Sequence, residues 1–187
     1  VLTLAEPTGG DGAYFLRLAL EDAARRVVSR NFYWLSTRDD VLDWKATKGG
    51  NSGLMYGVVE DKKYDAAWKT GPEYQFIDDV GFPEKLEEWQ KAGANYAMHL
   101  PNAQKQLKPV GEWNNSRIVV RGPHVEHWLN GKKILEFERW TPAWKKLRDA
   151  GKWNEAPDYG LAKTGRLVLQ DHGSVFWFRN VKIRTIQ

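Results

Sequence analysis

The chain has 187 residues, of which 42% are apolar and 28% are charged, with a formal net charge of +4. This composition excludes an intrinsically disordered chain, and no apolar run approaches the roughly 20 residues of a transmembrane helix. The absence of cysteine excludes disulfides, thiolate metal sites and a cysteine nucleophile. The length suits one globular domain, here taken to span residues 1–187.

The basic charge does not indicate a nucleic-acid partner, because lysines and arginines alternate with acids, as in Glu84–Lys91 (EKLEEWQK). We therefore expect neither a nucleic acid nor a membrane as partner. The ten tryptophans are more informative, since aromatic rings that line a groove stack well on apolar sugar faces. The chain begins at Val1 without a signal-peptide pattern, which is typical of a processed or trimmed product.

The first predicted elements are two antiparallel strands. Residues 13–20 alternate as a strand, residues 21–25 supply a turn, and residues 26–36 form the partner strand. Residues 41–44 suit either a short strand or a single helical turn, and the pattern leaves both open.

A glycine-rich segment, Lys48–Gly53, predicts a sharp break before a strand at residues 54–60. Its glycines permit backbone angles that other residues resist, so Asn51 and Ser52 could lie close to a ligand. A plain loop is the alternative.

The strand predicted at residues 70–79 places Glu73 and Gln75 on one face, with Tyr74 and Phe76 on the other. An acid and an amide backed by aromatic rings suit a polar site, although a solvated strand face has a similar pattern.

Two short helices are predicted at residues 83–93 and 141–151. Each has proline near its start and glycine at its end, and both are expected to cover an end or edge of a sheet.

Strands are also predicted at residues 112–121 and 124–138, and Asn130–Gly131 divides the second of these segments into a hairpin. His127 lies three residues before this turn. Taken alone, a single histidine there is more often a structural residue than a ligand or base.

The segment Gly165–Arg184 contains two apolar runs around a polar knot, Gln170–Gly173 (QDHG). The runs are predicted as strands and the knot as the loop or bulge between them. A carboxylate beside an imidazole on a rigid sheet is suited to proton transfer, whereas a polar hairpin turn is the simpler interpretation.

Together these elements predict about nine or ten strands and two short helices, without βαβ alternation or repeats. The fold class is therefore all-β, an antiparallel β-sandwich or jelly roll, in which a concave sheet face is the natural ligand groove.

Six motifs in order carry a family resemblance over about three-quarters of the chain. They are residues 50–56 (GNSGLMY), 70–75 (TGPEYQ), 109–114 (PVGEWN), 126–131 (EHWLNG), 169–173 (LQDHG) and 178–183 (FRNVKI). Residues 48–187 thereby resemble the 3-keto-disaccharide hydrolases, also described as 3-keto-glycoside lyases. The resemblance implies a concanavalin-like jelly roll, a periplasmic or secreted bacterial protein, and cleavage of sugars whose C3 hydroxyl has been oxidised to a ketone.

That reaction defines what the site needs. A C3 ketone acidifies the C2 hydrogen, so a base can remove it and the enolate can expel the C1 substituent, after which water adds. The site therefore needs a base, a stabiliser for the enolate oxygen and an acid for the leaving oxygen. The expected partner is an oligosaccharide or 3-keto-glycoside substrate.

The resemblance implies the positions of the site residues, and their roles are our hypothesis. His172, oriented by Asp171, is the predicted base, and Glu73 and Glu112 are candidates for the acid or for metal ligation. A divalent metal ion is left open as the cofactor, with its ligands unknown. The predicted substrate-binding residues are Asn51, Gln75, Trp113, His127 and Gln170.

The chain departs from the family at two places. Ala97 stands where the family usually has an acid after the tyrosine. Residues 1–47, an atypical N-terminal hairpin segment, resemble instead part of an immunoglobulin-like domain of β-mannosidase or exo-glucosaminidase-type glycoside hydrolases. This indicates a junction near residues 47–48, as in a chimera, whose hairpin completes the sandwich or pairs with a second copy in a homodimer. A non-catalytic carbohydrate-binding sandwich and a chimera without evolved activity are the alternative functions.

Overall fold

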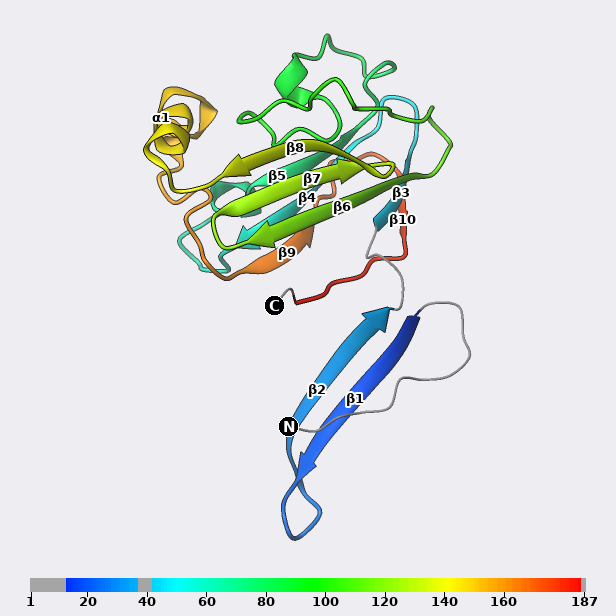
Figure 1. Ribbon diagram of the computed structural model, residues 1–187, viewed down its shortest axis with the longest axis vertical. Coiled ribbons are helices and arrows are strands. Elements are labelled where there is room, and N and C mark those ends of the chain that lie inside the picture. The colour runs from blue at the N-terminus through cyan, green and yellow to red at the C-terminus, as the bar shows by residue number, and fades with distance from the viewer. Residues whose placement is uncertain (1–12, 37–41, 186–187) are drawn as a thin grey trace. The chain divides into compact units, whose positions relative to one another are not determined.

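The computed structural model describes residues 13–36 and 42–185 (Figure 1). The chain divides into two compact units, one formed by Val1–Leu42 with Asn180–Gln187 and the other by Asp43–Arg179. The single domain predicted for residues 1–187, with its junction at 47–48, stays a prediction. The described residues contain no helix that is long and apolar enough to cross a membrane.

In the first unit, β1 (Ala13–Glu21) and β2 (Val27–Ser36) form an antiparallel hairpin, as predicted. The carboxylate of Asp22 closes its turn, because it accepts the backbone N–H groups of Ala24 and Arg26 at 2.9 Å each. A short acidic side chain that bonds the backbone two residues on is typical of such turns.

The second unit is a sandwich of two sheets with antiparallel strand pairs (Figure 1). The larger sheet has the order β10-β3-β6-β7-β8 and the smaller has the order β5-β4-β9. This confirms the predicted all-β sandwich, while the jelly-roll connectivity stays a prediction. The strands are β3 (Leu42–Ala46), β4 (Asn51–Val58), β5 (Glu73–Ile77), β6 (Asn114–Arg121), β7 (His124–Leu129), β8 (Lys132–Glu138), β9 (Arg166–Leu169) and β10 (Phe176–Arg179).

Aromatic side chains from both sheets fill the space between them. The ring of Phe76 on β5 lies 5.0 Å from that of Trp44 on β3, and the ring of Tyr74 lies 4.6 Å from that of His127 on β7. The Trp44 indole N–H donates to Ser116 Oγ at 3.0 Å, and Ser116 in turn donates to the Tyr74 hydroxyl at 2.8 Å. Buried aromatic rings supply much of the apolar burial in a core, and here their polar atoms are also paired.

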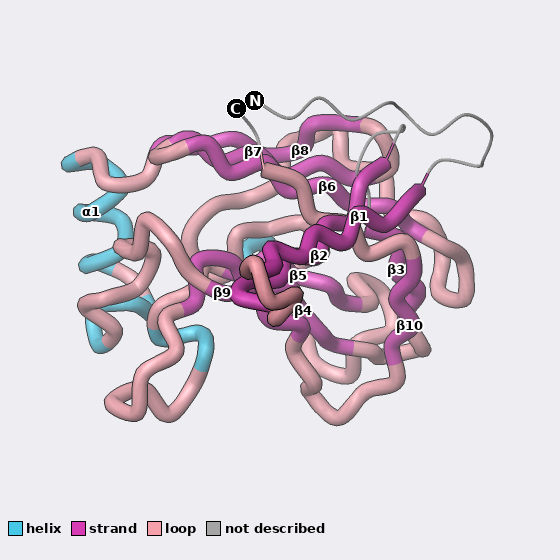
Figure 2. Tube along the Cα trace, turned by 90° about the horizontal axis from the view of Figure 1, so that it is seen from below, coloured by secondary structure: helices cyan, strands magenta, loops and turns pink. Residues whose placement is uncertain are grey.

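One predicted helix is confirmed. The α1 helix spans Pro142–Ala150, and the Thr141 hydroxyl accepts the backbone N–H of Trp144 at its N-terminus. It lies at the end of the sandwich opposite β3 and β10 (Figure 2).

The helix predicted at residues 83–93 is wrong, because this segment contains only the 3₁₀ turn η2 (Glu88–Gln90). Beyond that turn the backbone N–H of Ala92 donates to the Asp79 carboxylate, and Gly93 N–H donates to the Gln75 carbonyl of β5. In a helix both N–H groups would donate to carbonyls of the same helix. Because they donate to Asp79 and Gln75 beside the sheet instead, the helix does not form. Two further 3₁₀ turns, η1 (Ala67–Lys69) and η3 (Lys152–Glu155), lie outside the predicted elements.

The glycine-rich break is shorter than predicted. The turn closes where Gly50 N–H donates to the Thr47 carbonyl, and β4 already begins at Asn51. Pairing with β5, which places Asn51 opposite Ile77, draws the rest of the segment into the sheet. Asn51 and Ser52 are therefore strand residues, not loop residues.

The two remaining predicted turns have different outcomes. Asn130 and Gly131 have φ of 48° and 79°, as a two-residue hairpin between β7 and β8 requires, so that prediction is confirmed. The Gln170–Gly173 knot, by contrast, does not join strands of one sheet. β9 pairs with β4 and β10 pairs with β3, so the knot lies on a crossing between the two sheets.

Candidate active site

A cavity of about 140 Å³ opens beside the smaller sheet. Its walls come from β4, β5, the 3₁₀ turns η1 and η3, the segment after η2, and the crossing after β9. The lining residues are Asn51, Trp68, Glu73, Gln75, Tyr96, Lys152, Trp153, Gln170 and His172. The structure therefore brings together predicted site residues from three separate parts of the chain, namely Asn51, Glu73, Gln75, Gln170 and His172.

Strand register sets the position of the Glu73 carboxyl. β4 and β5 pair so that Gly53 lies opposite Gln75, and a side-chain Cβ built at Gly53 would be 1.9 Å from Glu73 Oε1. Glycine at this position therefore makes the room in which the carboxyl lies. On the same strands the Gln75 amide donates to Asn51 Oδ1 at 2.8 Å, which orients both amides in the cavity wall.

Glu73 is the electrostatically unusual group in the cavity. Its side chain is 5% exposed, and Oε1 is buried without a hydrogen-bond partner among the described residues. Burial raises the pKa of Glu73 to about 7, although the charge of Lys152 acts in the opposite direction. A buried, unpaired carboxyl oxygen destabilises the fold, so its place beside a cavity makes Glu73 a candidate functional group.

The crossing after β9 is tethered to β4. The Gln170 backbone N–H donates to the Gly53 carbonyl at 2.9 Å, and its carbonyl accepts the Ser52 hydroxyl at 2.7 Å. His172 is exposed in the cavity wall. Asp171 does not line the cavity, and its carboxylate accepts the Gly173 N–H at 2.9 Å. Asp171 thus stabilises the local turn, and its predicted orientation of His172 has no support from these contacts.

Two other predicted residues, Glu112 and Trp113, lie away from the cavity. Glu112 is exposed in a turn before β6, where its N–H donates to the Pro109 carbonyl. The Trp113 ring packs against Arg179, whose guanidinium carbon is 4.0 Å from the ring centroid. Both residues precede β6 in the larger sheet, whereas the cavity lies beside the smaller one.

His127, a predicted sugar ligand, is fully buried in the core. Nδ1 lies 3.0 Å from the Gly93 carbonyl and Nε2 lies 3.1 Å from the Tyr56 hydroxyl. A carbonyl can only accept, so Nδ1 carries the proton and Nε2 accepts from Tyr56. With both nitrogens paired inside the protein, His127 has no atom free for a sugar.

Burial lowers the pKa of His127 and of His99 to about 4. Both are neutral in the fold, so an unfolded chain takes up their protons first as the pH falls below about 6.5, and stability falls until about pH 4. Glu73 opposes this trend between pH 7 and 4.5 because its pKa is raised. Two histidines outweigh one carboxyl, so we expect a net loss of the order of 2 kcal/mol between pH 7 and 4.5. Urea unfolding at the two pH values measures it, and equal unfolding free energies would contradict the buried-histidine account.

Four aromatic or basic residues of the cavity were not predicted: Trp68, Tyr96, Lys152 and Trp153. They come from 3₁₀ turns and irregular segments, where periodicity carries no signal. The abundance of tryptophan was the one feature of the sequence that indicated aromatic side chains in a ligand groove. The Trp153 indole N–H donates to the Tyr96 carbonyl at 3.3 Å, and its ring stacks 4.2 Å from that of Tyr159. Ala97, beside Tyr96, has a φ of 58° and does not line the cavity.

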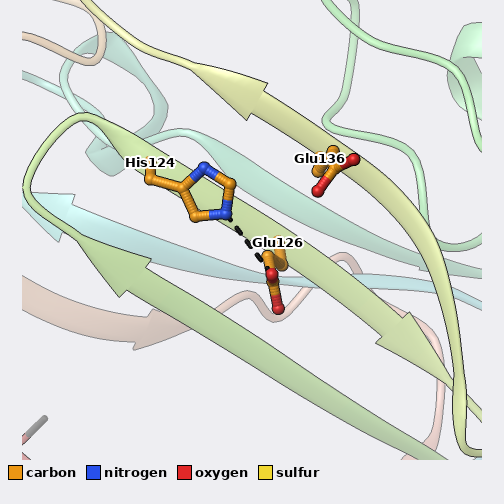
Figure 3. Close-up of side chains that lie close together, drawn as sticks. All are labelled: His124, Glu126 and Glu136. Atoms are coloured by element: carbon orange, nitrogen blue, oxygen red, sulfur yellow. Dashed lines mark hydrogen bonds and ion pairs between the residues drawn. The ribbon is translucent and has the colours of Figure 1, made fainter.

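Among the described residues, one histidine–carboxylate group has the spacing of a metal site, formed by His124, Glu126 and Glu136 (Figure 3). Lys133 already forms ion pairs with both carboxylates of this group, and His124 Nδ1 bonds Glu138 at 2.6 Å. The adjoining carboxylates also raise the pKa of His124, which favours the protonated ring. An ammonium and an imidazolium there do not fit a metal ion. The group does not include Glu73 or Glu112.

The second unit is therefore an antiparallel β-sandwich with an aromatic-lined polar cavity around one buried carboxyl. Residues 41–184 match the model of the 3-keto-alpha-glucoside-1,2-lyase-like domain, and the chain belongs to this family. It is 31% identical over 166 residues to a 3-keto-disaccharide hydrolase of Bacteroides thetaiotaomicron, covering 78% of this chain and 57% of that protein.

Two crystal structures from Parabacteroides distasonis, each described as a "putative glycosyl hydrolase", are also similar. One has 49% identity and a TM-score of 0.70, covering 74% of this chain and 66% of that one. The other has 27% identity and a TM-score of 0.56, covering 78% and 76%. The chain thus spans 57% of its curated hydrolase relative and 66% of the first of these structures.

A separate, short match concerns the exo-beta-D-glucosaminidases. A stretch of 47 residues, 25% of this chain, is 53% identical to the enzyme of Streptomyces avermitilis and 67% identical to that of Arthroderma benhamiae. It covers 5% of either protein. This agrees with the second resemblance found in the sequence, and the proposed junction stays a prediction.

Proposed function

We propose that this chain cleaves the glycosidic bond of 3-keto-glycosides by elimination followed by hydration. The observation that carries the proposal is the buried Glu73 carboxyl at the wall of a polar cavity of about 140 Å³. Its Oε1 is unpaired among the described residues, and its pKa is raised to about 7. A base whose pKa lies near the working pH is efficient in proton transfer. Membership of the lyase-like family supports the same chemistry.

In the proposed reaction Glu73, not His172, removes the C2 proton. The electron pair of the C2–H bond forms the enolate of the C3 ketone, and the enolate expels the C1 oxygen to give a C1=C2 double bond. Water then adds across that bond, its oxygen to C1 and a proton from Glu73 to C2. The net result is hydrolysis, with the ketone retained.

His172 is proposed as the acid that protonates the leaving oxygen. It lines the same cavity as Glu73 but is exposed, so it can exchange its proton with water between turnovers. Gln75 and Asn51, which are hydrogen-bonded to each other in the cavity wall, are proposed to hold sugar hydroxyls. The exposed ring of Trp68 supplies a flat apolar surface for the sugar.

The direct test uses 4-nitrophenyl 3-keto-α-glucoside, with the unoxidised 4-nitrophenyl α-glucoside as matched control. We expect nitrophenol release from the keto sugar alone, because only the C3 ketone acidifies the C2 hydrogen. Parallel reactions with a chelator show whether a divalent metal takes part. Binding without release would support a carbohydrate-binding module instead, and equal cleavage of the unoxidised glucoside would exclude elimination, because elimination requires the ketone.

His172→Ala is expected to reduce turnover by about 10²–10⁴-fold while the fold is retained. The loss should be larger for a methyl 3-keto-glucoside than for the nitrophenyl substrate, because nitrophenolate leaves without a proton. Asp171→Ala is the matched control and should lose far less, since the Asp171 carboxylate bonds its own turn at Gly173. Equal losses with both leaving groups would exclude His172 as the acid.

A further inference from the structure

Lys152 begins η3, and its ammonium lies among three aromatic rings of the cavity. Its nitrogen is 4.6 Å from the ring centroid of Tyr96, 5.0 Å from that of Trp153 and 5.9 Å from that of Trp68. Cations are attracted to the faces of aromatic rings, so these contacts hold the end of a long, otherwise flexible side chain in one place.

The same ammonium acts electrostatically on Glu73. Its charge lowers the pKa of Glu73, the Glu73 charge raises that of Lys152, and burial lowers the pKa of Lys152 further. Within the described part of the chain the two groups form no salt bridge, and Glu73 Oε1 stays unpaired. The positive charge is therefore held near the carboxylate by rings that do not neutralise it.

We propose that the Lys152 ammonium binds the C3 carbonyl oxygen of the substrate and stabilises the negative charge that this oxygen gains in the enolate. The inference rests on the proposed function. C2 and C3 are neighbouring ring carbons, so the base for C2 and the partner of the C3 oxygen must line one small cavity, as Glu73 and Lys152 do.

The charges balance in this step. As the proton passes from C2 to Glu73, one negative charge moves from the carboxylate to the C3 oxygen beside the ammonium. Lysine keeps its protons and forms no covalent bond. A fixed positive charge aimed at the atom where negative charge develops is the most effective kind of transition-state stabilisation. A lysine already neutralised by a salt bridge would stabilise the enolate oxygen much less.

Among the described residues, four charged or titratable groups face Glu73. They are Lys152 from η3, His172 from the crossing after β9, and the hydroxyls of Tyr96 and Tyr159. Burial raises the pKa of both tyrosines, so they stay neutral near pH 7. Removing the lysine charge should therefore raise the pKa of Glu73 and move the acid limb of kcat/KM to higher pH.

The experiment compares Lys152→Met, Lys152→Arg and, as matched control, Lys146→Met at an exposed position of α1. On the nitrophenyl keto-glucoside, Lys152→Met should lower kcat by about 10²–10³-fold and shift the acid limb upward. Lys152→Arg should recover at least about tenfold of that loss, because guanidinium also binds an oxyanion and stacks on aromatic rings. The Lys146 variant should match the wild type.

Each other result has a defined meaning. Full activity of Lys152→Met with an unmoved acid limb would overturn the inference. A Lys152→Arg variant as inactive as Lys152→Met would also overturn it. An electrostatic role needs only a positive charge, whereas a reaction in which the uncharged amine attacks the ketone requires lysine itself. Circular dichroism and thermal unfolding confirm that each variant is folded. A wild-type chain without turnover would remove the proposed function, whereas active wild type with unaffected variants would remove only the role of Lys152.

Discussion

Glu73→Gln is expected to reduce turnover of a 3-keto-glycoside by about 10²–10⁴-fold and, in the same variant, to stabilise the fold at pH 8. The amide has almost the same size and shape as the carboxyl, so the cavity should keep its form. It can neither accept the C2 proton nor carry a buried negative charge. This one substitution therefore has opposite expected effects on turnover and on the free energy of unfolding.

The sign of the stability change follows from the raised pKa. Because the pKa of Glu73 rises from 4.5 to about 7 on folding, the native state holds its proton more tightly than the unfolded chain. Stability therefore falls as the pH rises from 4.5 to 7, and the full penalty of the buried charge is present above pH 7. The shift corresponds to at most about 3 kcal/mol, so we expect Glu73→Gln to gain about 1–3 kcal/mol at pH 8 and little at pH 4.5.

Urea unfolding at pH 8 and pH 4.5 measures this difference, and kcat/KM on the keto-glucoside measures the activity. The exposed Glu155→Gln in η3 is the matched control and should change neither by much. An active Glu73→Gln variant would exclude Glu73 as the base. A variant less stable than the wild type at pH 8 would contradict the buried, unpaired charge.

His127→Ala is expected to destabilise the fold by about 2–4 kcal/mol without changing kcat/KM in the molecules that remain folded. The substitution removes a fully buried ring and leaves the Tyr56 hydroxyl and the Gly93 carbonyl without their partner. The loss therefore combines a cavity in the core with unpaired buried polar groups.

The matched control for this prediction is His124→Ala, which alters a partly exposed histidine three residues earlier on the same strand. We expect it to cost less than about 1 kcal/mol, because surface ion pairs contribute little. Unfolding by urea at pH 7 compares the two. A His127→Ala variant of wild-type stability and reduced affinity for the keto sugar would restore the role in sugar binding.

Local sequence patterns were sufficient where a strand or cap depends on near neighbours. The Asn130–Gly131 turn and the Thr141 cap specify their elements through contacts a few residues apart, and the alternation of residues 13–20 and 26–36 does so through the pairing of two strands that follow each other in the chain. The segment at residues 83–93 has equally good local helix signals. It fails as a helix because Asp79 and the Gln75 carbonyl, distant in sequence, bond its N–H groups.

The sequence by itself determined the all-β class and the family motifs, because alternation and motif order are properties of the chain. The family resemblance also indicated five residues that line the cavity, namely Asn51, Glu73, Gln75, Gln170 and His172. Only the tertiary structure decided that Glu73 is buried with Oε1 unpaired among the described residues, that His127 belongs to the core, and that Lys152 faces the cavity. Burial, and with it the pKa of a carboxyl or an imidazole, depends on which distant segments cover a side chain. No local pattern encodes that covering.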